Sequence, residues 1–174
     1  MSIPTFVDLQ GFIVSGKFIV KEMAVLRRGT ILAHYIFRNP IPWHLLTKSE
    51  KCQVSWLTAN HHGLQWEHGI IEYSMAKRLI TTAVIEEDDE MQRIVYVKGY
   101  QKRKWLADML GDDARENLII ETLDADYDDI ESLNNLDVKN TMRCGKHVKN
   151  CALQNVFKIF NWWSQRQKEL QNLK

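Results

Sequence analysis

Three short apolar segments joined by tight turns open the chain, and they constrain its fold more than any other feature. Each segment is rich in Phe, Val, Leu and Ile, which favours strands. The segments are residues 5–14, 18–26 and 30–37. Ser15-Gly16-Lys17 and Arg28-Gly29 separate them, and glycine tolerates the positive φ angle that such turns need. Because Pro40 and Pro42 follow, the pattern predicts an antiparallel three-stranded meander that ends before them.

Predicted helices and strands alternate in the rest of the chain. We expect helices at residues 47–58, 74–85, 102–110, 130–136 and 148–168, and strands at residues 93–98 and 118–123. Thr47 and Glu50 have the spacing of a capping box, and residues 86–90 are an acidic surface loop. Alternation of this kind is typical of parallel strands covered by helices. The prediction is one α/β domain over residues 1–174, with a mixed sheet flanked by helices.

The net charge conceals an uneven distribution of charged residues. The chain has 174 residues, is 45% hydrophobic and carries a formal charge of +1. This composition fits one globular domain and excludes a disordered chain. Residues 138–174, however, hold eight basic residues and one acid, a net charge of +7, which leaves −6 for residues 1–137. The sequence therefore allows polyanion binding at its basic end.

Membrane insertion and secretion are not expected. No apolar run approaches the roughly 20 residues of a membrane-spanning helix. The first residues also lack the basic stretch and apolar stretch of a secretory signal. We expect an intracellular protein, cytoplasmic or nuclear, with reduced thiols. Its three cysteines are too few and odd in number for a disulfide framework.

Cys144, His147 and Cys151 place three metal-ligand side chains within eight residues. If a helix begins near His147, then His147 and Cys151 lie one turn apart on one face, and Cys144 folds over the same point. Tetrahedral zinc needs one further ligand. The alternative is a pair of buried cysteines beside a hydrogen-bonded histidine. Cys52, on a predicted helix, is expected in the core.

Two groups of basic residues are candidates for nucleic-acid contacts. They are Lys98, Lys102, Arg103 and Lys104 after the fourth predicted strand, and Arg143, Lys146 and Lys149 beside the cysteines. Cations of this kind neutralise phosphates, and Trp162 is a candidate for stacking on bases. For the basic residues, the alternative is a solvated face without a ligand. For the tryptophans, the alternative is core packing, although only one of the adjacent residues Trp162 and Trp163 can face inward.

Asp8 lies within an apolar strand, where aspartate has low propensity and needs a partner if buried. It is either a remnant of a metal or nucleic-acid site or a structural hydrogen-bonding group.

The order of elements resembles the 3′-to-5′ exonuclease branch of the ribonuclease H-like fold. Residues 6–12 are similar to its first motif, a strand carrying Asp-x-Glu, and residues 61–64 resemble its Thr-His-Gly-Ile element. Residues 95–99 and 144–152 fall where its second and third motifs lie. The resemblance implies two-metal catalysis, which needs several carboxylates. Here only Asp8 is kept; the other expected positions hold Gln10, Gln101-Lys102 and Cys151-Ala152. We therefore expect a catalytically degenerate domain.

Cys144, His147 and Cys151 also resemble part of the Glu-Cys-His-Cys zinc site of the Maelstrom domain, an exonuclease-like fold of small-RNA-guided silencing. Residues 39–43 and 60–64 are similar to two further segments of that domain. Its glutamate has no clear counterpart here, so we expect the fourth ligand at His61 or His62. The resemblance implies a structural zinc and either single-stranded RNA binding or an adaptor role, with a protein partner, in an RNA-silencing (piRNA-type) or antiviral pathway.

Two other functions compete with this expectation. The first is an active metal-dependent nuclease that uses Asp8 with Glu22 or another carboxylate. The second is a protein-interaction module that uses an exposed tryptophan and the acidic residues 86–90, without binding nucleic acid.

Overall fold

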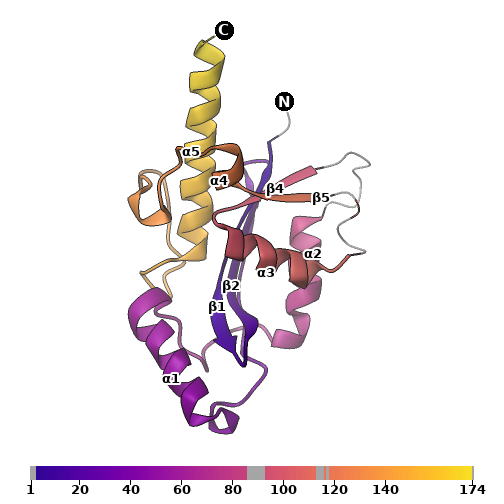
Figure 1. Ribbon diagram of the computed structural model, residues 1–174, viewed down its shortest axis with the longest axis vertical. Coiled ribbons are helices and arrows are strands. Elements are labelled where there is room, and N and C mark those ends of the chain that lie inside the picture. Colours follow the sequence, from indigo (N-terminus) through magenta and orange to yellow (C-terminus); the bar gives the residue numbers. More distant parts are fainter. Residues whose placement is uncertain (1–2, 86–92, 113–115, 117, 174) are drawn as a thin grey trace.

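A five-stranded mixed sheet forms the centre of the computed structural model, which describes residues 3–85, 93–112, 116 and 118–173 (Figure 1). Its strands are β1 (Thr5–Val14), β2 (Lys17–Arg27), β3 (Ile31–Ile36), β4 (Arg93–Val97) and β5 (Leu118–Thr122). They lie in the order β3-β2-β1-β4-β5. β1, β2 and β3 pair antiparallel, whereas β4 pairs in parallel with both β1 and β5. The predicted meander and the predicted parallel strands are both confirmed.

Helices lie on either side of this sheet. They are α1 (Lys48–Leu57), α2 (Ala76–Val84), α3 (Tyr100–Leu110), α4 (Leu123–Asp126) and α5 (Ala152–Asn172), with shorter turns at Trp43–Leu45, Thr58–His62, Tyr73–Met75 and Leu133–Asn135. The capping box of Thr47 and Glu50 is confirmed. Residues 130–136 hold only a three-residue 3₁₀ turn, and α4 was not predicted. The acidic residues 86–90 lie outside the described residues.

Alternation along the strands gives the sheet two apolar faces. Val7 and Leu9 lie in a core cluster with α2 and α3, whereas Phe6 and Ala24 pack with α5 on the other face. Asp8 is paired with Ala24, and Gln10 is paired with Glu22. Asp8 and Glu22 therefore belong to the face that α5 covers, close to the beginning of that helix.

A third cluster joins the tip of the β1–β2 hairpin to α1, where Phe12 and Ile19 pack with Val54. Cys52 is exposed, so its expected place in the core is wrong. Val54 is the buried residue of α1, and Cys52 lies two positions before it. Two helical residues with this spacing point to nearly opposite sides, so Cys52 faces solvent. Among the described residues, no helix is both long and apolar enough to cross a membrane.

Candidate metal centre

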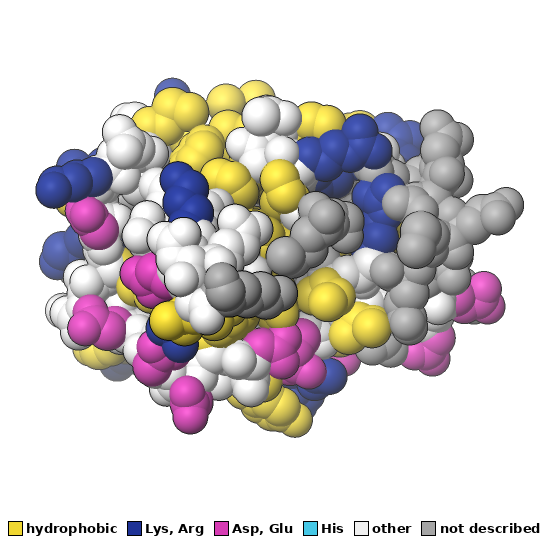
Figure 2. All heavy atoms as spheres, turned by 90° about the horizontal axis from the view of Figure 1, so that it is seen from above, with side chains coloured by type: hydrophobic (Ala, Val, Ile, Leu, Met, Phe, Trp, Pro, Cys, Tyr) yellow, Lys and Arg dark blue, Asp and Glu magenta, His cyan; other side chains and the backbone are white. Residues whose placement is uncertain are grey.

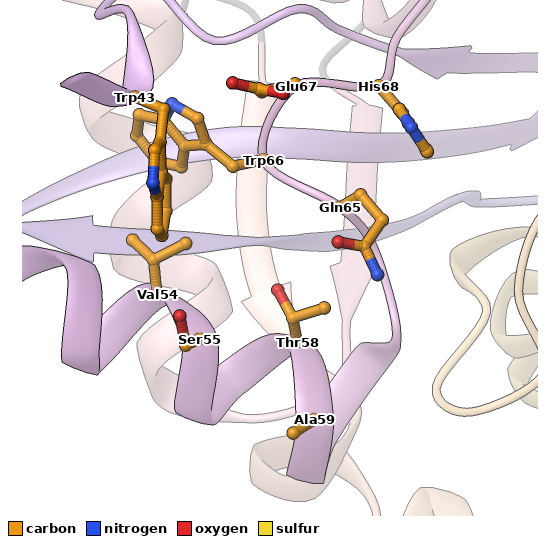
Figure 3. Close-up of a pocket in the computed structure, with 9 residues that line it drawn as sticks. All are labelled: Trp43, Val54, Ser55, Thr58, Ala59, Gln65, Trp66, Glu67 and His68. Atoms are coloured by element: carbon orange, nitrogen blue, oxygen red, sulfur yellow. The ribbon is translucent and has the colours of Figure 1, made fainter.

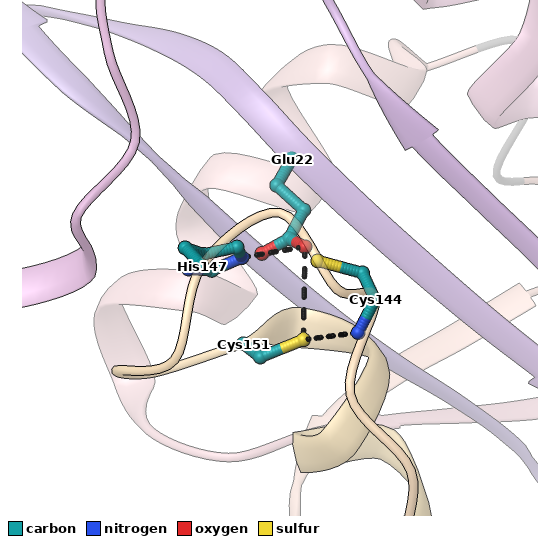
Figure 4. A group of neighbouring side chains, drawn as sticks. All are labelled: Glu22, Cys144, His147 and Cys151. Carbon is teal, nitrogen blue, oxygen red and sulfur yellow. Dashed lines mark hydrogen bonds and ion pairs between the residues drawn. The ribbon is translucent and has the colours of Figure 1, made fainter.

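Four side chains from two distant parts of the chain converge at the start of α5 (Figure 4). Glu22 comes from β2, Cys144 and His147 from the loop of residues 144–151, and Cys151 directly precedes the helix. One ligand atom from each lies within 4.8 Å of all the others, and three of the four side chains are buried. Two sulfurs, one imidazole nitrogen and one carboxylate oxygen are a donor set that could hold a metal ion. We call these four residues the metal centre.

Residues 144–151 form an irregular loop that precedes α5 and is not part of that helix. Gly145 and Asn150 have φ angles of 81° and 49°, which interrupt helical backbone. α5 consequently begins at Ala152, and the expectation that His147 and Cys151 share a helical face is wrong. This loop directs amide groups at both sulfurs. Cys144 N donates to Cys151 Sγ at 3.3 Å, and Lys146 N donates to Cys144 Sγ at 3.4 Å.

His147 is held in one orientation by backbone carbonyl groups. Its Nδ1 lies 2.6 Å from the oxygen of His62 and 3.0 Å from that of Lys149. A carbonyl oxygen only accepts, so Nδ1 carries a proton. The Nε2 atom then faces Glu22 Oε2 at 2.9 Å. A neutral imidazole fixed in this way presents a lone pair to an ion shared with the carboxylate, as metal-binding histidines do.

Glu22 is a fully buried carboxylate whose partners define its position. Oε1 accepts a hydrogen bond from Ala152 N at 2.8 Å, at the positive end of the α5 dipole. Oε2 lies 2.8 Å from His34 Nε2. Burial favours the neutral acid, but hydrogen bonds from His147, His34 and Ala152 outweigh it and lower the pKa of Glu22 to about 2. The carboxylate is therefore ionised at neutral pH.

The pKa values of the other three groups of the metal centre are also shifted from their ordinary values. Burial lowers the pKa of His147, but contacts with Cys151 and Glu22 outweigh it and raise that pKa to about 10. Burial raises the pKa of the Cys144 thiol to about 11. Burial also opposes the Cys151 thiolate, yet hydrogen bonds from His147 and backbone amides leave the pKa of Cys151 below its usual value. Protons and a cation thus compete for the same donor atoms.

The loop containing His61 and His62 reaches the metal centre without supplying the predicted ligand. From this loop, the backbone oxygen of His62 accepts a hydrogen bond from His147. The ring nitrogens of His62 face Gly11 O and Leu64 N, both at 3.0 Å. His61 is exposed, with Asn150 Nδ2 donating to its backbone oxygen at 2.6 Å. The fourth residue of the metal centre is Glu22, in place of the predicted His61 or His62.

Asp8 is buried and fully engaged by neighbouring side chains. Lys102 Nζ pairs with Oδ1, Asn155 Nδ2 donates to Oδ2 at 2.9 Å, and Gln10 Nε2 lies 3.5 Å from Oδ2. Burial raises the pKa of Asp8, and Lys102 and Asn155 oppose that shift. An ammonium group thus lies on the carboxylate that the exonuclease resemblance assigns to a catalytic metal.

Several of the predicted nucleic-acid residues are occupied within the protein. Lys98 pairs with Asp124, and Lys102 pairs with Asp8. Arg103 Nε donates to Ile120 O at 2.8 Å. These contacts reduce what the three side chains can offer to a phosphate.

The remaining predicted cations are exposed, namely Lys104, Arg143, Lys146 and Lys149. Lys146 and Lys149 lie on the loop of residues 144–151, on either side of His147, and Arg143 directly precedes that loop. Trp162 is half-buried, edge-on to Tyr127 and beneath Arg166, whereas Trp163 is buried, so only one of the two faces inward, as expected. On the end of the molecule seen in Figure 2, basic and acidic side chains are interspersed, and we assign no polyanion site there.

A cavity of about 370 Å³ lies apart from the metal centre, between α1 and residues 65–68 (Figure 3). Trp43, Val54 and Trp66 form its apolar wall, with His68 at its edge. None of the predicted site residues lines this cavity.

Comparisons with known proteins add no family assignment. A scan against protein-family models found no match, and a search of curated proteins found no similar sequence.

Proposed function

We propose that this chain is a ribonuclease H-like domain of the exonuclease branch, resembling the Maelstrom domain, that binds single-stranded RNA without cleaving it. The ion pair between Asp8 and Lys102 carries the proposal. Two-metal catalysis requires carboxylates that are free to bind divalent ions. Asp8 is neutralised by an ammonium group, and Glu22 belongs to the metal centre. A nuclease that uses these two carboxylates is correspondingly disfavoured.

Zinc is the metal that we propose for the metal centre. Two thiolates, one imidazole and one carboxylate suit zinc better than magnesium or calcium, which prefer oxygen ligands. With Glu22, Cys144, His147 and Cys151 as its four ligands, a bound zinc would have a closed site, as structural zinc sites do. The ion would join β2, the loop of residues 144–151 and the start of α5, which stabilises the fold.

Exposed cations on the loop of residues 144–151 and directly before it support the proposed RNA binding. Arg143, Lys146 and Lys149 are exposed next to side chains that the ion would fix in place. A fixed set of cations binds phosphates with less loss of conformational freedom than a mobile set. An adaptor role in an RNA-silencing or antiviral pathway belongs to the proposal through the resemblance alone.

The test is fluorescence anisotropy with labelled single-stranded RNA at low salt, followed by incubation with Mg²⁺ or Mn²⁺. We expect binding that weakens as salt rises, and RNA that stays intact. Metal-dependent cleavage that disappears in Asp8→Asn would establish the nuclease alternative. Undetectable binding at low salt would favour the protein-interaction module, for which Trp56, 62% exposed on α1, is the supporting observation.

A further inference from the structure

β3 is an edge strand with an open backbone. It is the last strand of the sheet beyond β2. At its two ends, Thr30 N donates to Arg27 O and Phe37 N donates to Lys21 O. Together with the register, these bonds direct the N–H and C=O groups of Ile31, Ala33 and Tyr35 toward β2. The corresponding groups of the residues between them point outward.

Two residues provide the free part of this edge. Ile36 O is already covered, because it accepts hydrogen bonds from the backbone N–H groups of residues 70 and 71. No described residue pairs with the outward backbone groups of Leu32 and His34. At the opposite edge of the sheet, Arg103 covers part of β5 by donating to Ile120 O. β3 is therefore an open edge of the sheet between its two covered ends.

The sequence of β3 lacks the usual protection of an edge strand. Its six residues, Ile-Leu-Ala-His-Tyr-Ile, include no lysine, no acid and no proline. Ile31 is 41% exposed and Leu32 is 36% exposed. Natural edges normally carry charge, proline or a covering segment, because an uncharged open edge pairs with another strand.

We propose that β3 pairs antiparallel with β3 of a second copy of this chain, about a two-fold axis at Ala33. In this register Leu32 of each copy lies opposite His34 of the other. The outward N–H and C=O groups of Leu32 and His34 are then satisfied in each strand. The small Ala33 side chains meet at the axis, where a non-hydrogen-bonded pair brings side chains closest.

Two features of the chain favour a second copy over an unrelated strand. The free groups of Leu32 and His34 are centred on Ala33, so the same short segment of a second copy matches them one for one. Ile31 lies at one end of β3, and Ile70 lies beside the other end, where its N–H donates to Ile36 O. Antiparallel pairing therefore brings Ile70 of one copy next to Ile31 of the other. Ile70 is 76% exposed in the single chain. Covering both is favourable because apolar surface leaves water.

The test is the mass of the protein in solution, measured by light scattering across a concentration series. We expect the wild type to reach twice the chain mass of 20.5 kDa, and Ile31→Lys to stay at the chain mass. Ile119→Lys is the matched control, because Ile119 is also 41% exposed but lies on the other edge strand, β5. It should keep the doubled mass.

Leu32→Pro provides a second variant. This substitution removes an outward N–H group and no hydrogen bond to β2. It should therefore halve the mass, while circular dichroism shows a folded chain. If this variant does not fold, the mass of Ile31→Lys tests the proposal. In the wild type, amide hydrogen exchange at Leu32 and His34 should slow as concentration rises. A wild type at the chain mass at every concentration would overturn the proposal, as would a dimer that persists in Ile31→Lys or leaves these two amides unprotected.

Discussion

His147 Nε2 lies 2.9 Å from Oε2 of Glu22, although the two residues are 125 positions apart in the chain. The opposite ring nitrogen is committed to backbone carbonyl groups, so whatever lies between Nε2 and the carboxylate must be positively charged. A proton or a metal ion satisfies that requirement. The contact thus attaches the loop of residues 144–151 to the sheet and gives the metal centre its fourth donor.

Removing His34 should weaken metal binding without removing a ligand. His34 Nε2 lies 2.8 Å from Glu22 Oε2 and helps to orient the carboxylate. Loss of such an outer contact typically lowers metal affinity about 10–100-fold. We expect a decrease of that size for His34→Ala, measured by competition with a chromophoric zinc chelator. His44→Ala, at an exposed position, is the control, and equal affinities in the two variants would refute this role for His34.

Binding of zinc at neutral pH should release protons. The pKa of Cys144 is about 11 and that of His147 is about 10, so both groups are protonated before the ion binds. Coordination requires the thiolate and a free Nε2 lone pair. Calorimetry in buffers of different ionisation enthalpy should therefore detect protons leaving, and acidification should weaken binding. A binding enthalpy that is independent of the buffer would contradict this prediction.

Lys102→Met should destabilise the fold by about 3–5 kcal/mol, because it leaves the buried Asp8 carboxylate without its ammonium partner. The double variant Asp8→Asn/Lys102→Met should recover part of that loss. The measurement is the free energy of unfolding in urea, with Lys104→Met as an exposed control that changes it by less than about 0.5 kcal/mol. Strictly additive effects of the two substitutions would show that the pair is not coupled.

Lys146→Met and Lys149→Met should each weaken RNA binding to a similar degree for all sequences. Neutralising one phosphate contact lowers the salt dependence of single-strand binding by about 0.7 in the slope of log K against log salt. Anisotropy titrations at several salt concentrations measure this slope. Lys168→Met is the control, because Lys168 is exposed about 24 Å further along α5 than its first residue. An effect of equal size in the control would indicate diffuse attraction instead of a local site.

Local patterns predicted most of the elements in the sheet. β1 has the predicted bounds, because its run of Phe, Val, Leu and Ile is closed by a glycine turn. The cysteines and His147 were found because they are close together in the chain. Glu22 was missed as a ligand, since nothing in the sequence indicates which residue of β2 meets a loop more than 120 positions later. Its one local signal was a charged residue in an apolar strand.

The errors near the metal centre have a physical cause. An unbroken helix from residue 148 was predicted from its apolar spacing, but the positive φ angle of Asn150 delays the start to Ala152. His61 or His62 was predicted as the fourth ligand because the glutamate of the resembling zinc site has no clear counterpart in the sequence. Their loop does reach the metal centre, and it contributes a backbone oxygen to His147 in place of a ring nitrogen. Side-chain direction is decided by tertiary packing, which periodicity does not encode.

The most direct test of the account is metal analysis by mass spectrometry of the purified wild type, Cys144→Ser and Cys52→Ser. Cys52 is the matched control because it is an exposed thiol on α1, outside the metal centre. We predict about one zinc per chain in the wild type and in Cys52→Ser, and a marked loss in Cys144→Ser, with a lower unfolding temperature. A metal-free wild type that is as stable as the zinc-loaded protein would contradict the account.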